Sequence, residues 1–170
     1  TNDKYTPTLI SEILDETLVF CREKFKSHGV RVEINESHKN LFIDARPVEI
    51  SQVLLNLLNN AFDAISDLEE EHLWIRIDIK KQLDSVKLSI TDGGKGISKE
   101  IADKILEPFF TTKSVNKGTG LGLSISRNII TKHEGRLELD QKSPHTKFDI
   151  IIPLSPSVSG LECPSSKKAA

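Results

Sequence analysis

The stretch QVLLNLLNNAFDAI, residues 52–65, predicts the helix around which the rest of the chain is organised. Its apolar residues recur every three or four positions, which is the spacing of one face of an α-helix. Pro47 suits a first helical turn, so we expect the helix to cover about residues 47–66. Its apolar face comprises Ile50, Val53, Leu54, Leu57, Ala61 and Ile65.

Two asparagines and an aspartate lie beside this apolar face. Asn56 and Asn60 are four residues apart and therefore stack on one side of the helix, with Asp63 roughly in line. An amide oxygen is a suitable ligand for Mg²⁺, which otherwise keeps water and phosphate oxygens around itself. For two asparagines in isolation, a solvated helix face is the ordinary alternative.

A second polar segment, DGGKGI at residues 92–97, directly follows a predicted strand. The Asp92 carboxylate, held at the strand end, can accept a hydrogen bond from an exocyclic amine such as that of adenine. Gly94 and Gly96 let the backbone turn sharply and approach a flat ring. The alternative is a plain hairpin turn, which Asp-Gly commonly forms.

A third segment, GTGLGL at residues 118–123, opens a predicted helix over 121–133. Backbone N–H groups at a helix N-terminus suit phosphate oxygens, and glycines expose them. No Gly-Lys-Ser/Thr follows, as a P-loop would require, and no βαβ unit surrounds the segment, which argues against a dinucleotide-binding fingerprint. Simple helix capping is the alternative.

The segment before these glycines, residues 107–119, lacks periodicity and contains proline and glycine, which indicates a mobile loop. Phe109 and Phe110 could anchor it as a lid on the core. Three polar side chains could then reach phosphates: Thr111, Thr112 and Lys113. An ordinary surface loop with a buried aromatic residue is the alternative.

The remaining periodic segments complete a layered fold. Helical spacing predicts a helix over 9–27 and a short one over 98–106. Alternation and short apolar runs predict strands over 30–34, 41–43, 74–79, 86–90, 136–139 and 147–153. We expect one mixed sheet covered on one face by helices. By sequence, 1–27 is an N-terminal helix, 28–154 one domain, and 155–170 a disordered or extraneous tail.

Composition limits the classes of function. The chain has 170 residues, 37% hydrophobic and 28% charged, which is typical of a globular domain, and its net charge of -2 predicts no nucleic-acid partner. No apolar run approaches the roughly 20 residues of a membrane span. No signal peptide is visible, but the chain begins without Met and we expect upstream segments to be missing. Two cysteines without metal spacing, Cys21 and Cys163, indicate a reduced, cytoplasmic setting.

Taken in order, these segments resemble the catalytic and ATP-binding domain of sensor histidine kinases, a family grouped with type II topoisomerases, Hsp90 chaperones and MutL repair proteins. The resemblance covers about residues 40–153, with 52–65 matching the N box, 92–97 the G1 box, 108–113 the F box and 118–123 the G2 box. It implies an α+β fold, a two-layer α/β sandwich. A mixed, mostly antiparallel sheet would be backed by helices, with a flexible ATP lid.

The resemblance also assigns roles to residues. It implies that Asn60 is the Mg²⁺ ligand, that Asn56 is its partner one turn earlier, and that Asp92 reads adenine. Asn56, Asn60 and Lys113 would be catalytic. The implied ATP site comprises Asn56, Asn60, Asp63, Asp92, Gly94, Gly96, Ile97, Phe110, Thr111, Thr112, Lys113, Gly118, Thr119, Gly120, Leu121, Gly122 and Leu123.

Asn56 separates the kinase interpretation from an ATP-hydrolysing one. The hydrolysing relatives carry a Glu at this position, which activates water as a general base, and an amide cannot take that proton. The resemblance therefore implies transfer of the ATP γ-phosphate to a histidine on a separate dimerisation domain. An ATP-hydrolysing switch and a pseudokinase binding module are the alternatives. Many family members carry Lys or Arg where Asp63 stands, so Lys113 or Arg127 would have to supply that charge.

None of the five histidines lies in the phosphoacceptor motif of the family. His133, followed by Glu134, imitates an acceptor but comes after the predicted G2 helix. We therefore expect a monomeric fragment that does not phosphorylate itself. Its parent would be a homodimer, membrane-anchored or soluble, acting on a response regulator.

Overall fold

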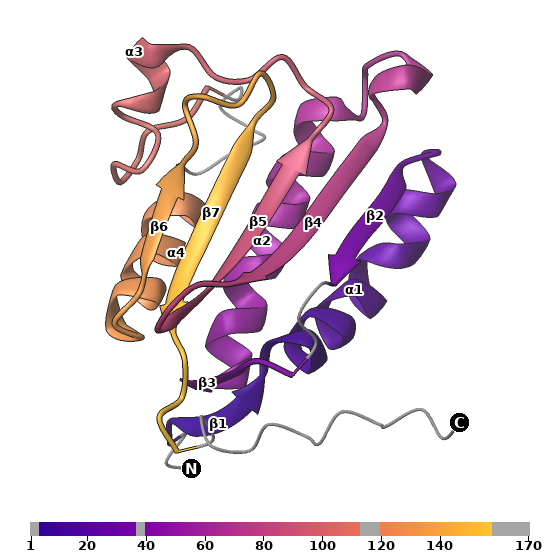
Figure 1. The fold of residues 1–170 in the computed structure, drawn as a ribbon. Helices are drawn as coiled ribbons and strands as arrows, with labels where there is room; N and C mark the ends of the chain where they lie inside the picture. The colour runs from indigo at the N-terminus through magenta and orange to yellow at the C-terminus, as the bar shows by residue number, and fades with distance from the viewer. Residues whose placement is uncertain (1–3, 37–39, 113–119, 158–170) are drawn as a thin grey trace, which may run out of the picture.

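A sheet and a layer of helices make up the molecule (Figure 1). The computed structural model describes residues 4–36, 40–112 and 120–157. The main sheet has five strands in the order β2-β4-β5-β7-β6, and only the β2–β4 pair is parallel. The mixed, mostly antiparallel sheet of the expected fold class is confirmed. Its strands are β2 (Arg31–Glu36), β4 (Trp74–Lys81), β5 (Ser85–Asp92), β6 (Arg136–Leu139) and β7 (Lys147–Pro153).

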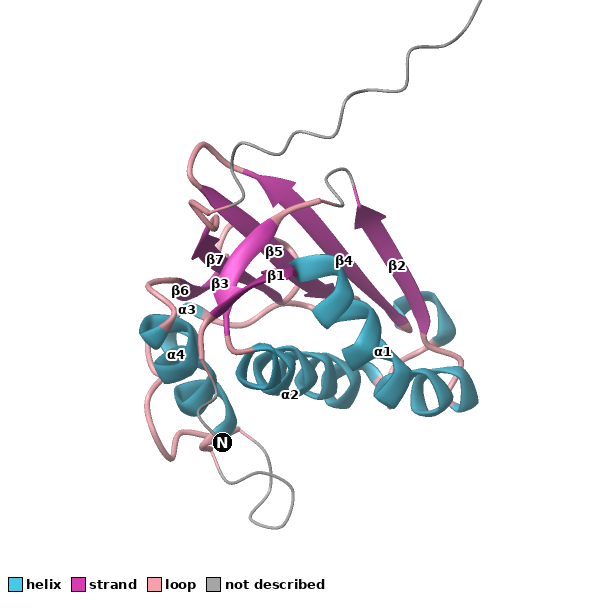
Figure 2. Ribbon diagram, turned by 90° about the horizontal axis from the view of Figure 1, so that it is seen from below, coloured by secondary structure: helices cyan, strands magenta, loops and turns pink. Residues whose placement is uncertain are grey.

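Three helices cover one face of this sheet, as Figure 2 shows. They are α1 (Ile10–Ser27), α2 (Pro47–Ile65) and α4 (Gly122–Lys132). Helix α2 packs against α1, α4 and the sheet, so it occupies the middle of the helical layer. The ranges predicted from helical spacing agree with these three helices to within one residue at each end.

The core lies between α2 and the central strands. Leu54 and Leu58 on α2 and Ile77 on β4 are fully buried. Ile77 is in register with Ile90 of β5, so both present their side chains to the helices. Burial of each such side chain contributes about 1.5–3 kcal/mol relative to exposure. This packing holds the polar side of α2 and the end of β5 in fixed relation.

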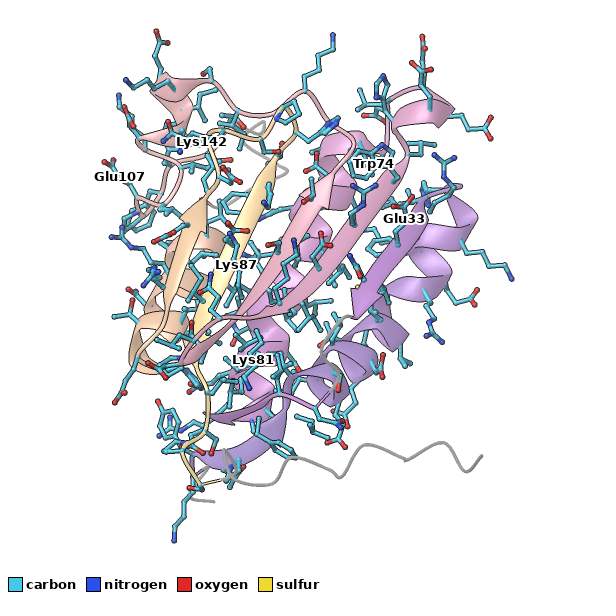
Figure 3. All side chains as sticks on the ribbon, in the orientation of Figure 1. Glu33, Trp74, Lys81, Lys87, Glu107 and Lys142 are labelled. Atoms are coloured by element: carbon cyan, nitrogen blue, oxygen red, sulfur yellow. The ribbon has the colours of Figure 1, made fainter. Side chains whose placement is uncertain are left out.

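The face of the sheet away from the helices is polar, and Figure 3 shows Lys87 among its side chains. Asp149 on β7 is buried there, and its carboxylate accepts a hydrogen bond from Ser89 Oγ at 2.6 Å and pairs with Lys87 Nζ at 2.6 Å. A buried charge needs such partners, because an unpaired one would be strongly destabilising. The sheet therefore needs no second helical layer.

A second, two-stranded sheet corrects the expectation of a single one. It pairs β1 (Thr6–Leu9) with β3 (Phe42–Ala45) in antiparallel fashion. The strand predicted over 41–43 is β3, but β1 carries no alternating pattern and its pairing depends on a segment distant in sequence. The chain after β7 also joins β3, since Ser155 donates from its backbone to Phe42 O and from Oγ to Asp44 Oδ1, both at 2.7 Å. Order thus extends past the start of the expected tail.

The helix predicted over 98–106 is much shorter than expected. Within this range only α3 (Lys99–Ala102) is helical. Elsewhere, between α2 and β4, a 3₁₀ turn, η1, covers Glu70–His72. After Ala102 the backbone turns so that Ile105 and Leu106 pack against the core. That tertiary packing replaces a continued helix. In the described parts of the chain, no helix combines the length and apolar character that crossing a bilayer requires.

Candidate functional site

A cavity of about 740 Å³ opens between α2, the end of β5 and the start of α4. Most residues expected at the ATP site line it. These are Asn56, Asn60, Asp63, Asp92, Gly96, Ile97, Phe110, Thr111, Thr112, Gly120, Gly122 and Leu123. Lys113, Gly118 and Thr119 fall outside the described residues, so their roles stay predictions.

The polar side of α2 faces this cavity. Asn56 donates from Nδ2 to Ser126 Oγ on α4 at 3.0 Å, and Asn60 lines the cavity one turn later. Asp63 lies at the exposed rim. The adjacent Asn59 points elsewhere, because its Oδ1 accepts a hydrogen bond from Lys24 Nζ of α1 at 3.1 Å. Only the asparagines spaced by a helical turn, and not Asn59, therefore belong to the site.

The start of α4 fits closely against Asn56. A Cβ added to Gly122 would collide with the Asn56 side chain, nearest to Oδ1. Gly122 thus lets α4 approach α2 at the cavity wall. Leu121 does not line the cavity; it precedes the helix, where its carbonyl accepts from Ile125 N–H and Ser124 Oγ.

Asp92 is the buried carboxylate of the cavity, with 3% of its surface exposed. Its Oδ1 accepts a hydrogen bond from Gly94 N–H at 2.8 Å. Burial raises the pKa of Asp92 to about 6, while the Gly94 and Thr146 hydrogen bonds and the His145 charge act in the opposite direction. Gly94 does not line the cavity, so its contribution is to hold Asp92. The carboxylate is thereby oriented as an acceptor next to an apolar wall.

A backbone hydrogen bond joins Phe109 and Gly120, which lie on either side of the undescribed residues 113–119. Phe109 N–H donates to Gly120 O at 3.0 Å, and both residues have positive φ, 66° and 67°. A Cβ on Gly120 would come within 2.8 Å of Phe110 O, so only glycine fits where the backbone at 120 approaches Phe109 and Phe110. The cavity therefore has a fixed edge at Phe110 and Gly120.

Seven lining residues escaped the sequence interpretation. Six are apolar and one is polar: Leu57, Ala61, Ala64, Ile90, Ile105 and Phe148, with Thr146. Leu57, Ala61 and Ala64 each lie next to Asn56, Asn60 or Asp63 on α2, and Ile90 lies two residues before Asp92 on one strand face, so spacing could have indicated these four. Phe148 lies at the cavity because β7 pairs with β5 so that Phe148 is opposite Ile90, and no local sequence pattern reveals this pairing.

Comparison with known proteins finds a matching family and similar sequences. The family described as "Histidine kinase-, DNA gyrase B-, and HSP90-like ATPase" matches residues 45–156. Sensor protein TdiS of Thauera aromatica is 34% identical over 152 residues, covering 88% of this chain and 27% of that protein. Sensory histidine kinase/phosphatase NtrB of Vibrio alginolyticus is 31% identical, covering 89% and 45%. The chain spans less than half the length of either relative.

Solved structures extend the likeness to three dimensions. The catalytic domain of histidine kinase ThkA superimposes with a TM-score of 0.78 at 31% identity, covering 91% of this chain and 98% of that one. A structure of ThkA in complex with response regulator protein TrrA matches with a TM-score of 0.76 at 30% identity, covering 90% of this chain and 42% of that one.

Proposed function

The chain belongs to the histidine kinase-, DNA gyrase B- and HSP90-like ATPase family, and we propose that it holds Mg·ATP for transfer of the γ-phosphate to a histidine on a separate dimerisation domain. Its likeness to sensor histidine kinases makes it the ATP-binding catalytic domain of such a kinase. The single observation that carries the proposal is the cavity in which Asn56, Asn60 and Asp92 meet.

Adenine recognition is assigned to Asp92. As a carboxylate it can accept a hydrogen bond from the exocyclic amine of adenine, and such a charge-assisted bond is strong when water is excluded. Ile90 and Phe148 flank it with apolar surface suited to a flat ring. Gly96 and Ile97 would border the base.

The phosphates are assigned to the other end of the cavity. Asn60 would hold Mg²⁺ through its amide oxygen, the kind of ligand this cation takes together with water and phosphate oxygens. When bound, the cation neutralises charge on the transferring phosphate. Thr111, Thr112, Gly120 and Gly122 line the same cavity and would contact phosphate oxygens.

Asn56 supports transfer over hydrolysis. Its amide donates to Ser126 and cannot accept a proton from water, so it supplies no general base. The attacking group would then come from another domain, as we propose for a histidine of a dimeric parent. A response regulator would receive the phosphate in turn; ThkA is seen in complex with one.

We also propose a cytoplasmic setting and a single ATP-binding unit over 28–154.

The test mixes this domain with the histidine-bearing domain of its parent in the presence of Mg·ATP. We expect acid-labile phosphate on that partner domain and none on this chain alone. Labelled phosphate on the isolated chain would contradict the proposal. Steady ATP hydrolysis above background would favour the switch of the related ATPases, and failure to bind any adenine nucleotide would favour a non-catalytic binding module.

Acidification should weaken ATP binding. Protonated Asp92 offers a donor where adenine needs an acceptor, and its pKa of about 6 places the change between pH 7 and 5. We expect roughly tenfold lower affinity at pH 5 than at pH 7.5. Calorimetry on wild type and Asp92→Asn at both pH values checks this. Protonation of the ATP phosphates affects binding to both proteins alike, so the difference between their pH profiles reports on Asp92. Parallel pH profiles would contradict the role of Asp92.

Gly122→Ala should weaken ATP binding with little loss of stability. The added Cβ would displace the flexible Asn56 side chain from Ser126, and the cost in stability is limited to about 1 kcal/mol for the lost hydrogen bond. We expect about three- to tenfold weaker binding, the equivalent of one hydrogen bond. Ser126→Ala, which removes the partner without a collision, should act in the same direction. Calorimetry and thermal unfolding measure both effects, and unchanged affinity in both variants would contradict this account.

A further inference from the structure

The turn before β7, residues 140–146, lies against the loop that carries Asp92. The backbone N–H of Asp92 donates to Thr146 O at 3.1 Å. A Cβ on Gly96 would come within 3.2 Å of Pro144 O. Asp140 stabilises the turn itself, accepting from Lys142 N–H and from Lys147 Nζ at 3.0 Å each. The turn therefore supports the glycine loop, with Thr146 lining the cavity and the preceding residues of the turn outside it.

His145 makes the most specific contact of this turn. Its Nδ1 lies 2.8 Å from Gly94 O, and because a carbonyl can only accept, Nδ1 carries the hydrogen and donates. Its ring packs edge-on against Trp74, with centroids 4.9 Å apart and planes at 79°. The ring is thus held from two sides, by a hydrogen bond and by an aromatic contact.

Gly94 is the link between His145 and the cavity. Its carbonyl accepts from His145 while its N–H donates to Asp92 Oδ1. Neighbouring Gly93 donates to Trp74 O at 3.0 Å and has no room for a Cβ, which would collide first with His72 O and then with Trp74 Nε1. The backbone that orients the Asp92 carboxylate is therefore fixed on its outer side by His145 and Trp74.

We propose that His145 is a positioning residue for nucleotide selection: by holding the Gly94 carbonyl, it fixes the loop geometry that aims Asp92 at the 6-amino group of the purine. The inference rests on the proposed ATP-binding function. His145 does not line the cavity and acts through Gly94 and Asp92. It determines how well the site distinguishes an aminopurine from a purine without the amine.

Two variants separate the hydrogen bond from the packing. His145→Phe keeps an aromatic ring against Trp74 but has no donor for Gly94. His145→Asn loses the ring but keeps a donor of similar reach in its side-chain amide. Lys142→Ala is the matched control, because its exposed side chain belongs to the same turn and its backbone hydrogen bond to Asp140 survives.

The measurement is calorimetric affinity for two ligands, ATP and the purine nucleoside triphosphate that lacks the 6-amino group. Wild type and Lys142→Ala should prefer ATP by about tenfold or more, as expected for a hydrogen bond to a charged acceptor. In His145→Phe this preference should fall by about three- to tenfold, mainly because ATP binds more weakly. In His145→Asn the preference should be retained. Thermal unfolding confirms that each variant is folded.

Three results would overturn the inference while leaving the proposed function intact. Equal weakening of both ligands by His145→Phe would make His145 a merely structural residue. Unchanged affinity for both ligands in His145→Phe would remove His145 from nucleotide binding, and a preference lost equally in His145→Asn would exclude the hydrogen bond as the cause. Failure of the wild-type protein to bind ATP would overturn the proposed function itself, and the inference with it.

Discussion

Asp92→Asn will bind ATP about 10- to 100-fold more weakly than wild type, because a charged acceptor for the adenine amine becomes a neutral amide. The Gly94 N–H already occupies one oxygen of the Asp92 carboxylate. In the variant the amide oxygen takes that N–H, and the amide nitrogen then faces the adenine amine, donor against donor. Isothermal titration calorimetry at pH 7.5 measures the loss.

The same substitution should not lower the stability of the nucleotide-free protein. Burial raises the pKa of Asp92 to about 6, above its unfolded value, so the folded state binds more protons between about pH 4 and 6. The contribution of Asp92 to stability therefore falls as pH rises through that range, and at pH 7 its ionised form costs on the order of 1–3 kcal/mol. A neutral amide avoids this cost.

Thermal unfolding at pH 7.5 tests this separation of function from stability. Asp84→Asn provides the control, since Asp84 is an exposed carboxylate in the turn between β4 and β5. We expect Asp84→Asn to leave ATP affinity unchanged. An Asp92→Asn variant that bound ATP like wild type would remove Asp92 from adenine recognition. A variant that unfolded much more easily would show that the carboxylate stabilises the fold.

Asn60→Ala is expected to abolish most of the gain in ATP affinity that Mg²⁺ provides. Its side chain lines the cavity where the phosphates are assigned, and removal of the amide oxygen leaves the cation without its protein ligand. We expect the Mg²⁺-dependent increase in affinity to fall by about tenfold or more, as for other losses of groups that support a metal site. Binding in the presence of EDTA should change little.

Asn59→Ala is the matched control for this variant. The residue precedes Asn60 on the same helix, but its side chain contacts Lys24 at the α1–α2 interface. Asn59→Ala should be slightly less stable than wild type and should keep the full increase in ATP affinity that Mg²⁺ provides. Calorimetry with and without Mg²⁺ compares the two alanine variants. An equal Mg²⁺ response in wild type and Asn60→Ala would remove Asn60 from the ligand role.

Local patterns predicted the parts of this protein whose structure depends on local physics. The three long helices follow from apolar spacing, and Pro47 begins α2 at the expected place. The helical period also brought Asn56 and Asn60 to one side of α2, and period-two alternation identified β4 and β5. The errors lie where distant contacts matter: after α3, Ile105 and Leu106 pack against the core, and β1 pairs with β3, which is remote in sequence.

The order of side chains along α2, the carboxylate at the end of β5 and the glycines before α4 follow from the sequence itself, because each depends on residues within one or two helical turns or one strand. Tertiary structure alone decided what surrounds them. The register of β5 with β7 brings Phe148 to Ile90, and the turn before β7 brings His145 to Gly94 and Thr146 to Asp92. Those partners lie 51 to 58 residues apart in the chain. Packing of the sheet and helices, which no local periodicity encodes, sets which of them meet.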